Sequence, residues 1–266
     1  MCLILVAWRA HPDYPLVVAA NRDEFFARRT AAASLWPDRN ILAGRDLQAG
    51  GTWLGINPKT GRFAALTNYR DPTRQRDRLA SRGLLVTDFL TSDTPATSWL
   101  EGLARRATDY NGFNLMAGDA SSLACLASIT GEVRTLQPGI YGLSNHLLDS
   151  PWPKVEVAKS ALATALNAVP DDSSLFSLLR DDTIHPDDAL PRTGVSREWE
   201  RLLSSAFVRA PGYGTRCSTV VMVANDGTTV FDEQTWLEGA KAGLRIRYRF
   251  RLPAPSPSRH GECPPR

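Results

Sequence analysis

The sequence has few cysteines, little net charge and no long apolar run, and each shortage excludes a class of protein. It contains 4 cysteines in 266 residues without a Cys-x-x-Cys pair, so we expect neither a disulfide framework nor a metal site. The apolar stretch from Cys2 to Trp8 is far shorter than the ~20 residues of a membrane span, and no basic region precedes it. We therefore expect no signal peptide, no integral membrane association and a reducing, cytoplasmic location.

Charge and composition exclude further classes of protein. Lys plus Arg number 31 against 28 Asp plus Glu, and the formal net charge of +3 is too small to indicate a nucleic-acid partner. Hydrophobic residues make up 43% of the chain, which is typical of a globular protein with a sizeable core. We find no change of pattern along residues 1–252 and predict one domain there, followed by a proline-rich disordered tail over 253–266.

Two hairpins are predicted in the first quarter of the chain. The apolar runs 2–8 and 16–20 flank a proline-containing turn, and the runs 52–56 and 62–67 flank a segment dense in turn-forming residues. Apolar residues at three- and four-residue spacing predict helices over 78–91, 95–108, 155–168 and 196–206. Further strands are predicted over 114–119, 123–128, 132–136, 218–224, 228–232 and 245–250. Strands in two groups with helices between them indicate an α+β protein of stacked sheets covered by helices.

Cys2 is the most informative single residue. Removal of the initiator Met would leave a free α-amine on the residue that carries the thiol, which joins a nucleophile and a candidate general base. The α-amine has a reference pKa of about 7.7–8.0, so it can act as a base near neutral pH. Alternatively, Cys2 is a small apolar residue at the start of a buried strand.

The first hairpin places polar residues beside Cys2. A turn centred near Pro12 pairs residues whose numbers sum to about 24, so Arg22 is expected opposite Cys2. In the run Asn21-Arg22-Asp23-Glu24, the guanidinium would favour the thiolate, and the carboxylates of Asp23 or Glu24 would orient the guanidinium or the amine. The alternative is an ordinary strand end that reaches solvent.

The second hairpin is expected to bring another two polar or glycine-rich motifs together. A turn centred near Lys59 is expected to place Gly50-Gly51 opposite Thr67-Asn68. Paired glycines permit close approach of the backbone to a ligand, and Asn68 with the following amides would supply donors to an oxyanion. A β-bulge with a hydrogen-bonded Asn explains the same residues.

These blocks carry a family resemblance. The motifs are Cys2, Asn21-Arg22-Asp23-Glu24, Gly50-Gly51-Thr52-Trp53-Leu54-Gly55, Thr67-Asn68-Tyr69, Tyr110-Asn111-Gly112-Phe113-Asn114-Leu115, Gly142-Leu143-Ser144-Asn145, Pro151-Trp152-Pro153-Lys154 and Gly212-Tyr213-Gly214-Thr215-Arg216. In order and spacing, the chain resembles the NRDE family, also called the transport and Golgi organization protein 2 family. The resemblance extends from Met1 to about Phe250.

The resemblance implies a four-layer αββα fold of the N-terminal-nucleophile hydrolase type. By similarity to the distant choloylglycine hydrolases and penicillin V acylases, it implies that Cys2 is the nucleophile and its α-amine the base. It further implies that Asn145 and the backbone N–H of Tyr69 form the oxyanion hole, and that Arg216 is a late active-site arginine. Those enzymes carry Asp three residues after their Arg, whereas Asp23 and Glu24 follow Arg22 directly, so the carboxylate that faces Cys2 stays open. Ligand-binding residues are expected at Asn21, Gly50, Gly51, Thr52, Trp53 and Asn68.

Two functions of different class follow. The first is hydrolysis of a small-molecule, non-peptide amide through a Cys2 acyl-enzyme, which requires no cofactor. The second, implied by the family's link to haem trafficking and lipid homeostasis, is a non-catalytic cleft that binds haem or an acyl lipid. Candidate haem ligands are Cys2, His11, His146, His185 and His260, and Cys263-Pro264 is a weaker indication. A third reading is that the motifs only brace loops.

Overall fold

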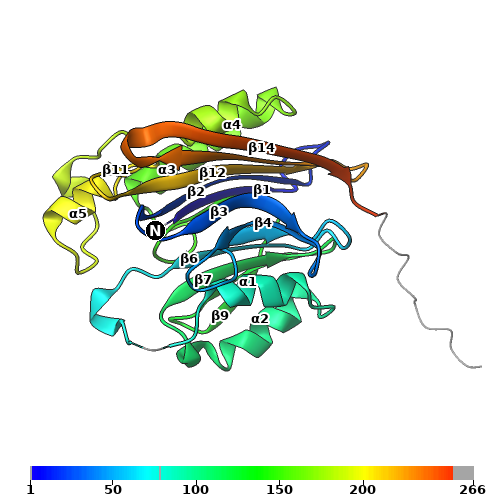
Figure 1. Cartoon of the computed structure of the whole chain (residues 1–266), viewed down its shortest axis with the longest axis horizontal. Coiled ribbons are helices and arrows are strands. Elements are labelled where there is room, and N and C mark those ends of the chain that lie inside the picture. The colour runs from blue at the N-terminus through cyan, green and yellow to red at the C-terminus, as the bar shows by residue number, and fades with distance from the viewer. Residues whose placement is uncertain (1, 78, 254–266) are drawn as a thin grey trace, which may run out of the picture.

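The computed structural model describes residues 2–77 and 79–253, and these fold into two antiparallel sheets (Figure 1). The first sheet has the order β10 (Gly139–Leu143), β1 (Cys2–Trp8), β2 (Leu16–Phe25), β12 (Tyr213–Val223), β13 (Thr228–Leu237) and β14 (Lys241–Arg251), and β11 (Arg209–Ala210) pairs with β12. The second sheet runs in chain order through β3 (Thr30–Trp36), β4 (Ile41–Asp46), β5 (Leu54–Ile56), β6 (Phe63–Asn68), β7 (Phe113–Gly118), β8 (Leu123–Ala127) and β9 (Glu132–Thr135).

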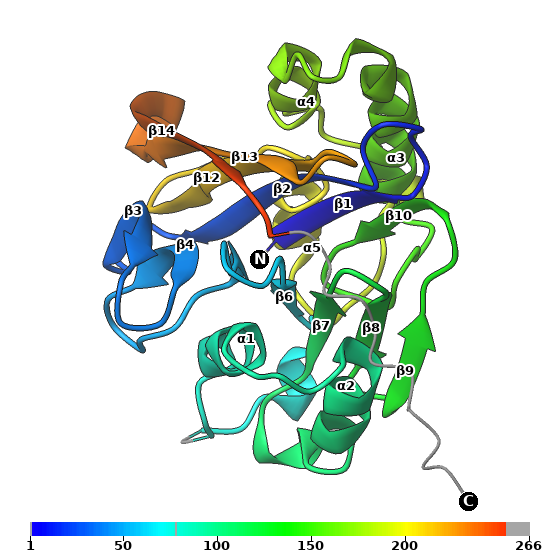
Figure 2. The same ribbon diagram turned by 90° about the vertical axis from the view of Figure 1, so that its right-hand side faces the viewer.

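Helices cover the outer faces of both sheets (Figure 2). The α-helices are α1 (Gly83–Leu90), α2 (Ala96–Ala104), α3 (Pro153–Ala165), α4 (Ser173–Leu178) and α5 (Arg197–Leu202). Short 3-10 turns lie at Pro72–Arg74, Ala107–Asp109, Leu166–Ala168, Asp187–Ala189 and Glu238–Ala240. One apolar cluster joins α1 and α2 to the second sheet, and another joins α3 and α4 to the first. The expected α+β arrangement of two antiparallel sheets and covering helices is confirmed.

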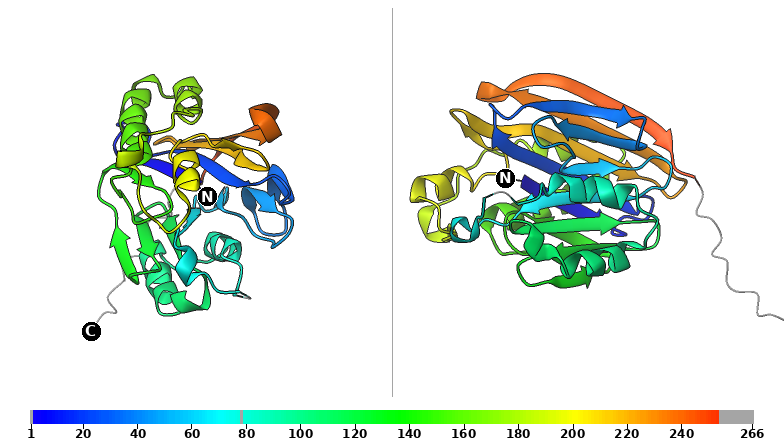
Figure 3. Two further views of the ribbon diagram at one scale, coloured as in Figure 1. Left: turned by 90° about the vertical axis from the view of Figure 1, so that its left-hand side faces the viewer. Right: turned by 60° about the horizontal axis from the view of Figure 1, so that its bottom comes forward.

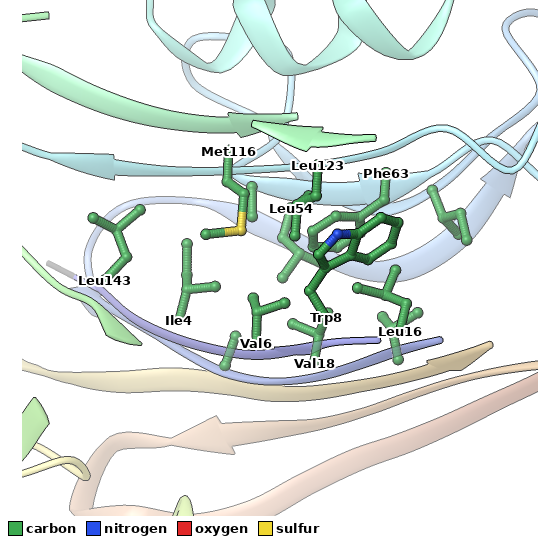
Figure 4. Close-up of a cluster of buried hydrophobic side chains, with 14 of the residues drawn as sticks. Ile4, Val6, Trp8, Leu16, Val18, Leu54, Phe63, Met116, Leu123 and Leu143 are labelled. Atoms are coloured by element: carbon green, nitrogen blue, oxygen red, sulfur yellow. The ribbon is translucent and has the colours of Figure 1, made fainter. Parts of the chain in front are cut away.

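A third apolar cluster holds the two sheets together (Figure 4). Ile4 and Val18 of the first sheet point toward Phe63 and Met116 of the second, and each of the four is at most 1% exposed. Because successive side chains of a strand point to opposite faces, alternate residues of β1 and β2 enter this layer and the others enter the helical layer. Each fully buried apolar side chain stabilises the fold by about 1.5–3 kcal/mol.

The first hairpin forms with the expected register, since Cys2 lies opposite Arg22. Its second strand is longer than predicted, because β2 continues through Phe25 and pairs on its other edge with β12. The polar run of residues 21–24 therefore lies inside a central strand and not beyond its end. In the second hairpin the strand pair covers only Leu54–Ile56 and its partners, so the expected pairing of Gly50-Gly51 with residues 67–68 does not form.

Other elements differ from the predictions in length or number. The predicted helix 78–91 begins only at Gly83, and the predicted helix 196–206 ends at Leu202. Strands β3, β4, β10 and β11 and the short helix α4 were not predicted. In β3 the exposed and buried residues do not alternate regularly, because its pairing with β4 shifts register between Ala31 and Ser34, so the period-two signal is lost.

No helix within the described residues is long and apolar enough to cross a membrane. The predicted tail, apart from Pro253, lies outside the described part of the chain.

Candidate active site

A cavity of about 730 Å³ opens at the end of the molecule where β1 begins. Figure 3 shows this end of β1, marked N, at the edge of the first sheet near the yellow segment that contains α5. The lining is rich in charge, with five arginines and four carboxylate residues, and it includes two thiols, Cys2 and Cys217. The arginines are Arg22, Arg28, Arg45, Arg82 and Arg216, and the carboxylates are Asp23, Glu24, Asp46 and Glu233.

Cys2 lines this cavity although only 8% of the residue is exposed. Burial raises the pKa of the Cys2 thiol, and the nearby Asp23 carboxylate raises it further. The Arg22 guanidinium and a hydrogen bond from the backbone N–H of Asp23 act in the opposite direction. Because the pKa is raised overall, the thiol is protonated at rest and needs a base before it can act as a nucleophile.

Arg22 lies at the centre of the first sheet's cavity face. It is paired across the ladder with Cys2 on one side and with Cys217 on the other. Its Nη2 lies 3.8 Å from Glu24 Oε2 and 3.9 Å from Asp46 Oδ2, so its charge is balanced by a carboxylate from each sheet. Asp46 in turn binds Arg28 Nε at 2.8 Å. This ion-pair group fixes the guanidinium beside the thiol.

The two carboxylates that follow Arg22 point in opposite directions. Glu24 shares the face of Arg22 on the same strand and lies beside it, with Oε2 3.8 Å from Arg22 Nη2. Asp23 borders the cavity, but its Oδ1 accepts a hydrogen bond from Thr215 Oγ1 at 2.7 Å on the helical side. Burial raises the pKa of the Asp23 carboxyl. Glu24 is therefore the carboxylate beside the Arg22 side chain, and Asp23 lies behind the strand.

Asn21, which we expected to bind ligand, does not line the cavity. It is fully buried, and its Nδ2 donates to the carbonyl oxygens of Leu179 at 2.7 Å and Ala206 at 2.8 Å. Its Oδ1 accepts from Ser218 Oγ at 2.6 Å. The bonds to Leu179 and Ala206 tie β2 to the segments over its outer face, and the bond from Ser218 ties it to β12. The strand alternation that turns Arg22 toward the cavity turns Asn21 away from it.

The glycine pair also departs from the expected ligand contact. Gly50 and Gly51 have φ angles of 68° and 72°, and a Cβ on Gly51 would lie 2.4 Å from the carbonyl oxygen of Gly83. The pair therefore permits close contact with the start of α1. The next two residues, Thr52 and Trp53, do line the cavity.

The expected oxyanion hole is only partly available. The backbone N–H of Tyr69 donates to the carbonyl of Gly112 at 2.9 Å, so it cannot also serve an oxyanion. Asn145 is fully buried, and its Nδ2 donates to the carbonyl of Asn68 at 2.9 Å without lining the cavity. Asn68 itself lines the cavity. Asn145 thus positions Asn68, which lines the cavity and is the candidate donor there.

Arg216 reaches the cavity from a β-bulge in β12, where the pairing with β2 shifts register. Its Nη1 donates to the carbonyls of Phe25 at 2.8 Å and Arg28 at 3.0 Å, and its Nη2 donates to Thr30 Oγ1 at 3.2 Å. Most of its donors are therefore used to join β12 to the loop after β2. Arg216 therefore lines the cavity, but these hydrogen bonds hold neighbouring segments of the chain together.

Arg82, Glu233 and Cys217 are among the cavity residues that were not singled out from the sequence, as are Arg28 and Asp46. Arg82 precedes α1 and lies close enough to Glu24 and Cys2 for their charges to act on it. Glu233 accepts from the backbone N–H of Ala33 at 2.7 Å, and its burial raises the pKa of its carboxyl. Cys217 is buried beside Glu233, and burial likewise raises the pKa of its thiol. The turn at 225–227 predicts which residues of β12 and β13 face each other, but the face turned to the cavity depends on the long-range pairing of β12 with β2.

Comparisons with known proteins cover the strands that build this site. A family model described as "Transport and Golgi organisation 2" matches residues 1–238. The Bos taurus protein "Transport and Golgi organization protein 2 homolog" is 40% identical over 262 residues, covering 89% of this chain and 94% of that protein. The Homo sapiens protein of the same name is 39% identical over 264 residues, covering 90% and 94%. The Drosophila melanogaster "Transport and Golgi organization protein 2" is 33% identical over 263 residues, covering 88% and 92%.

Proposed function

The chain belongs to the Transport and Golgi organisation 2 family, as its motifs indicated, and from that premise we propose that it hydrolyses non-peptide amide bonds through a Cys2 acyl-enzyme. The observation that carries the proposal is the position of Cys2. A thiol at the first strand of a central hairpin borders a cavity large enough for a small molecule, with a guanidinium directly opposite it in the ladder. We also propose that the sandwich is an N-terminal-nucleophile hydrolase fold, that residues 1–252 form one domain and that the protein works in the cytoplasm.

The proposed reaction has two steps. After removal of Met1, the α-amine of Cys2 takes the thiol proton, and Sγ forms a bond to the carbonyl carbon of the amide. The tetrahedral intermediate collapses, the C–N bond breaks, and the leaving amine takes the proton from the α-ammonium group. The α-amine of Cys2 then deprotonates a water molecule, which attacks the thioester carbon. The C–S bond breaks, a carboxylic acid is released, and the α-ammonium group returns its proton to the Cys2 thiolate.

The cavity residues have distinct parts in this scheme. Arg22 lowers the pKa of the Cys2 thiol, and Glu24 and Asp46 hold the guanidinium in place. The Asn68 side chain and the Arg82 guanidinium are the groups at the cavity that would stabilise the negative oxygen of the intermediate. Trp53 offers an apolar wall to the acyl or amine portion of the substrate.

The test compares the two cavity thiols. Cys2→Ala is expected to abolish turnover of a library of small amides and labelling by an electrophilic acyl probe, whereas Cys217→Ala in the same cavity should retain both. N-terminal sequencing of the purified protein establishes in parallel that Cys2 is the first residue. Turnover that persists in Cys2→Ala, or a retained Met1 in the active protein, contradicts the proposal.

Haem binding is the alternative, and the lining supports it less well. His11, His146 and His185 do not line the cavity, and His260 and Cys263 lie outside the described residues. The thiols that remain, Cys2 and Cys217, both have raised pKa values and are poor thiolate donors at rest. A haem titration followed by the Soret band tests this alternative, because loss of the band in a Cys2→Ala, Cys217→Ala double variant is required if the cavity ligates haem.

A further inference from the structure

The segment of residues 144–146, which follows β10, links the two sheets beside the candidate site. Ser144 is 3% exposed and Asn145 is fully buried. The strand before the segment belongs to the first sheet, whereas the segment itself is hydrogen-bonded to β6 and β7 of the second sheet. The proposed reaction gives no part to Ser144, although its hydroxyl contacts the backbone of the proposed nucleophile.

Cys2 lies where a strand ladder has not yet begun, so a side chain supplies its hydrogen bond on that edge. On one edge of β1, Cys2 pairs with Arg22. On the other edge, the ladder between β1 and β10 begins at Ile4 and Leu143. Ser144 Oγ donates to the carbonyl oxygen of Cys2 at 3.0 Å. Because the ends of a chain are poorly ordered unless they are tied down, this bond holds the first residue of β1 in place.

The other end of the segment is held by the second sheet. Asn145 Nδ2 donates to the carbonyl of Asn68 at 2.9 Å, and the Asn145 carbonyl accepts from the backbone N–H of Arg70 at 2.8 Å. Asn114 of β7 donates from its Nδ2 to the carbonyl of His146 at 2.8 Å. These three bonds fix the segment relative to the cavity end of β6.

The two ends are joined through adjacent residues. Ser144 Oγ lies 3.0 Å from the Cys2 carbonyl oxygen and 3.3 Å from Asn145 Oδ1, so its bond to Cys2 is the shorter one. The apolar layer between the sheets is not directional, whereas hydrogen bonds fix distance and angle. Since the peptide unit between Ser144 and Asn145 is planar, Cys2 and Asn68 cannot move apart without breaking one of these bonds.

We infer that Ser144 is a positioning residue for Cys2, and that the Ser144-Asn145 pair fixes the separation of Cys2 and Asn68 at the cavity. Ser144 acts through the backbone of Cys2 and lies outside the cavity lining. Its value for catalysis is that a displacement of about 1 Å at the reacting atoms can cost about 10²-fold in rate. This last consequence rests on the proposed function, whereas the tether on Cys2 does not.

The experiment measures how fast iodoacetamide alkylates Cys2 in the folded full chain, with Cys2 resolved from the other cysteines by peptide mass spectrometry. Because only 8% of Cys2 is exposed, the reagent reaches the thiol through local opening of the start of β1. Ser144→Ala leaves the Cys2 carbonyl without its donor and is expected to raise the rate about five-fold, the equivalent of about 1 kcal/mol for one net hydrogen bond. Ser144→Thr keeps the hydroxyl and should return the rate toward that of the wild type.

Ser205→Ala is the matched control. Ser205 is also 3% exposed, and its Oγ donates to the carbonyl of Phe207 at 2.9 Å, so loss of this hydroxyl should cost a similar amount of global stability. The Cys2 rate in Ser205→Ala should equal that of the wild type. A wild-type rate in Ser144→Ala, or an equal increase in Ser205→Ala, overturns the inference.

Hydrogen exchange of the wild-type protein gives a readout that does not depend on a variant folding. Arg70 lies beyond the last residue of β6, but its backbone N–H donates to the Asn145 carbonyl. This N–H should therefore exchange as slowly as the amides within β6. Exchange at the rate of an exposed loop amide contradicts the tie between the segment and the second sheet.

Activity separates this inference from the proposed function. If the protein hydrolyses amides, Ser144→Ala should lower kcat with little change in KM, because Ser144 lies outside the cavity lining, and Ser144→Thr should restore kcat. A change confined to KM contradicts a positioning role. If no amide is hydrolysed, the proposed function fails, while the alkylation rates still decide the role of Ser144.

Discussion

Replacing Asn21 by Ala should destabilise the protein without changing the chemistry of its cavity. Asn21 makes three buried hydrogen bonds, to the carbonyls of Leu179 and Ala206 and to the Ser218 hydroxyl, and Ala would leave all three partners without it. At about 1 kcal/mol for each net hydrogen bond, the free energy of unfolding should fall by about 3 kcal/mol. With an m-value of about 3 kcal/mol/M, this moves the urea midpoint down by about 1 M.

The assay combines urea unfolding with alkylation of Cys2 in the folded protein. Asn225→Ala is the control, because Asn225 makes one exposed hydrogen bond to the Pro12 carbonyl and should cost less than about 1 kcal/mol. Because Asn21 faces the helical layer, the alkylation rate of Cys2 in native buffer should equal that of the unmodified protein. A loss of stability below about 1 kcal/mol, or an altered Cys2 rate at full stability, would refute this reasoning.

Two further predictions concern the rim of the cavity. Gly51→Ala should lower the thermal midpoint and displace the start of α1, because the new Cβ would lie 2.4 Å from the Gly83 carbonyl oxygen and the φ of Gly51 is 72°. Gly131→Ala is the control, because Gly131 has a φ of 70° but no atom lies within 4 Å of its Cβ, so this variant isolates the cost of the backbone angle. Asp46 is partly buried, which raises its pKa, but hydrogen bonds from two backbone amides and from Arg28 outweigh the burial and lower the pKa overall. The ionised carboxylate therefore stabilises the fold at pH values above the usual pKa of Asp. This stabilisation is lost as the pH falls through the lowered pKa. Unfolding of Asp46→Asn measured from pH 7 to pH 2 should therefore show a deficit at neutral pH that disappears in acid, and a deficit that persists unchanged at pH 2 would contradict this account.

The part of the site that sequence could predict is the part built by local pairing. Cys2 lies opposite Arg22 because a short turn fixes the register of two apolar runs, and both the runs and the turn are visible in the sequence. Pattern alone also separated strands from helices well enough to indicate two covered sheets. The face to which Asp23 and Glu24 point follows from the same alternation, once β2 is known to continue through them.

The parts that sequence could not predict depend on contacts between distant segments. Arg82, Cys217 and Glu233 reach the cavity only because β12 pairs with β2 and the start of α1 packs against Gly51. No local periodicity encodes those pairings. The backbone N–H of Tyr69 shows the opposite case, in which a group expected at the site is not available. The sequence offers this N–H as a donor to an oxyanion, but in the folded protein it donates to the Gly112 carbonyl.

Because β2 pairs with β1 on one edge and with β12 on the other, the first sheet can be completed only late in protein synthesis. While the ribosome is still making the first two hundred residues, β2 can pair with β1 but exposes its other edge, including the backbone of Arg22 and Asp23. That edge is covered only when β12 emerges, late in synthesis. A nascent or truncated chain that ends before Tyr213 therefore carries an open strand edge near Cys2, and we expect such fragments to aggregate and to depend on chaperones.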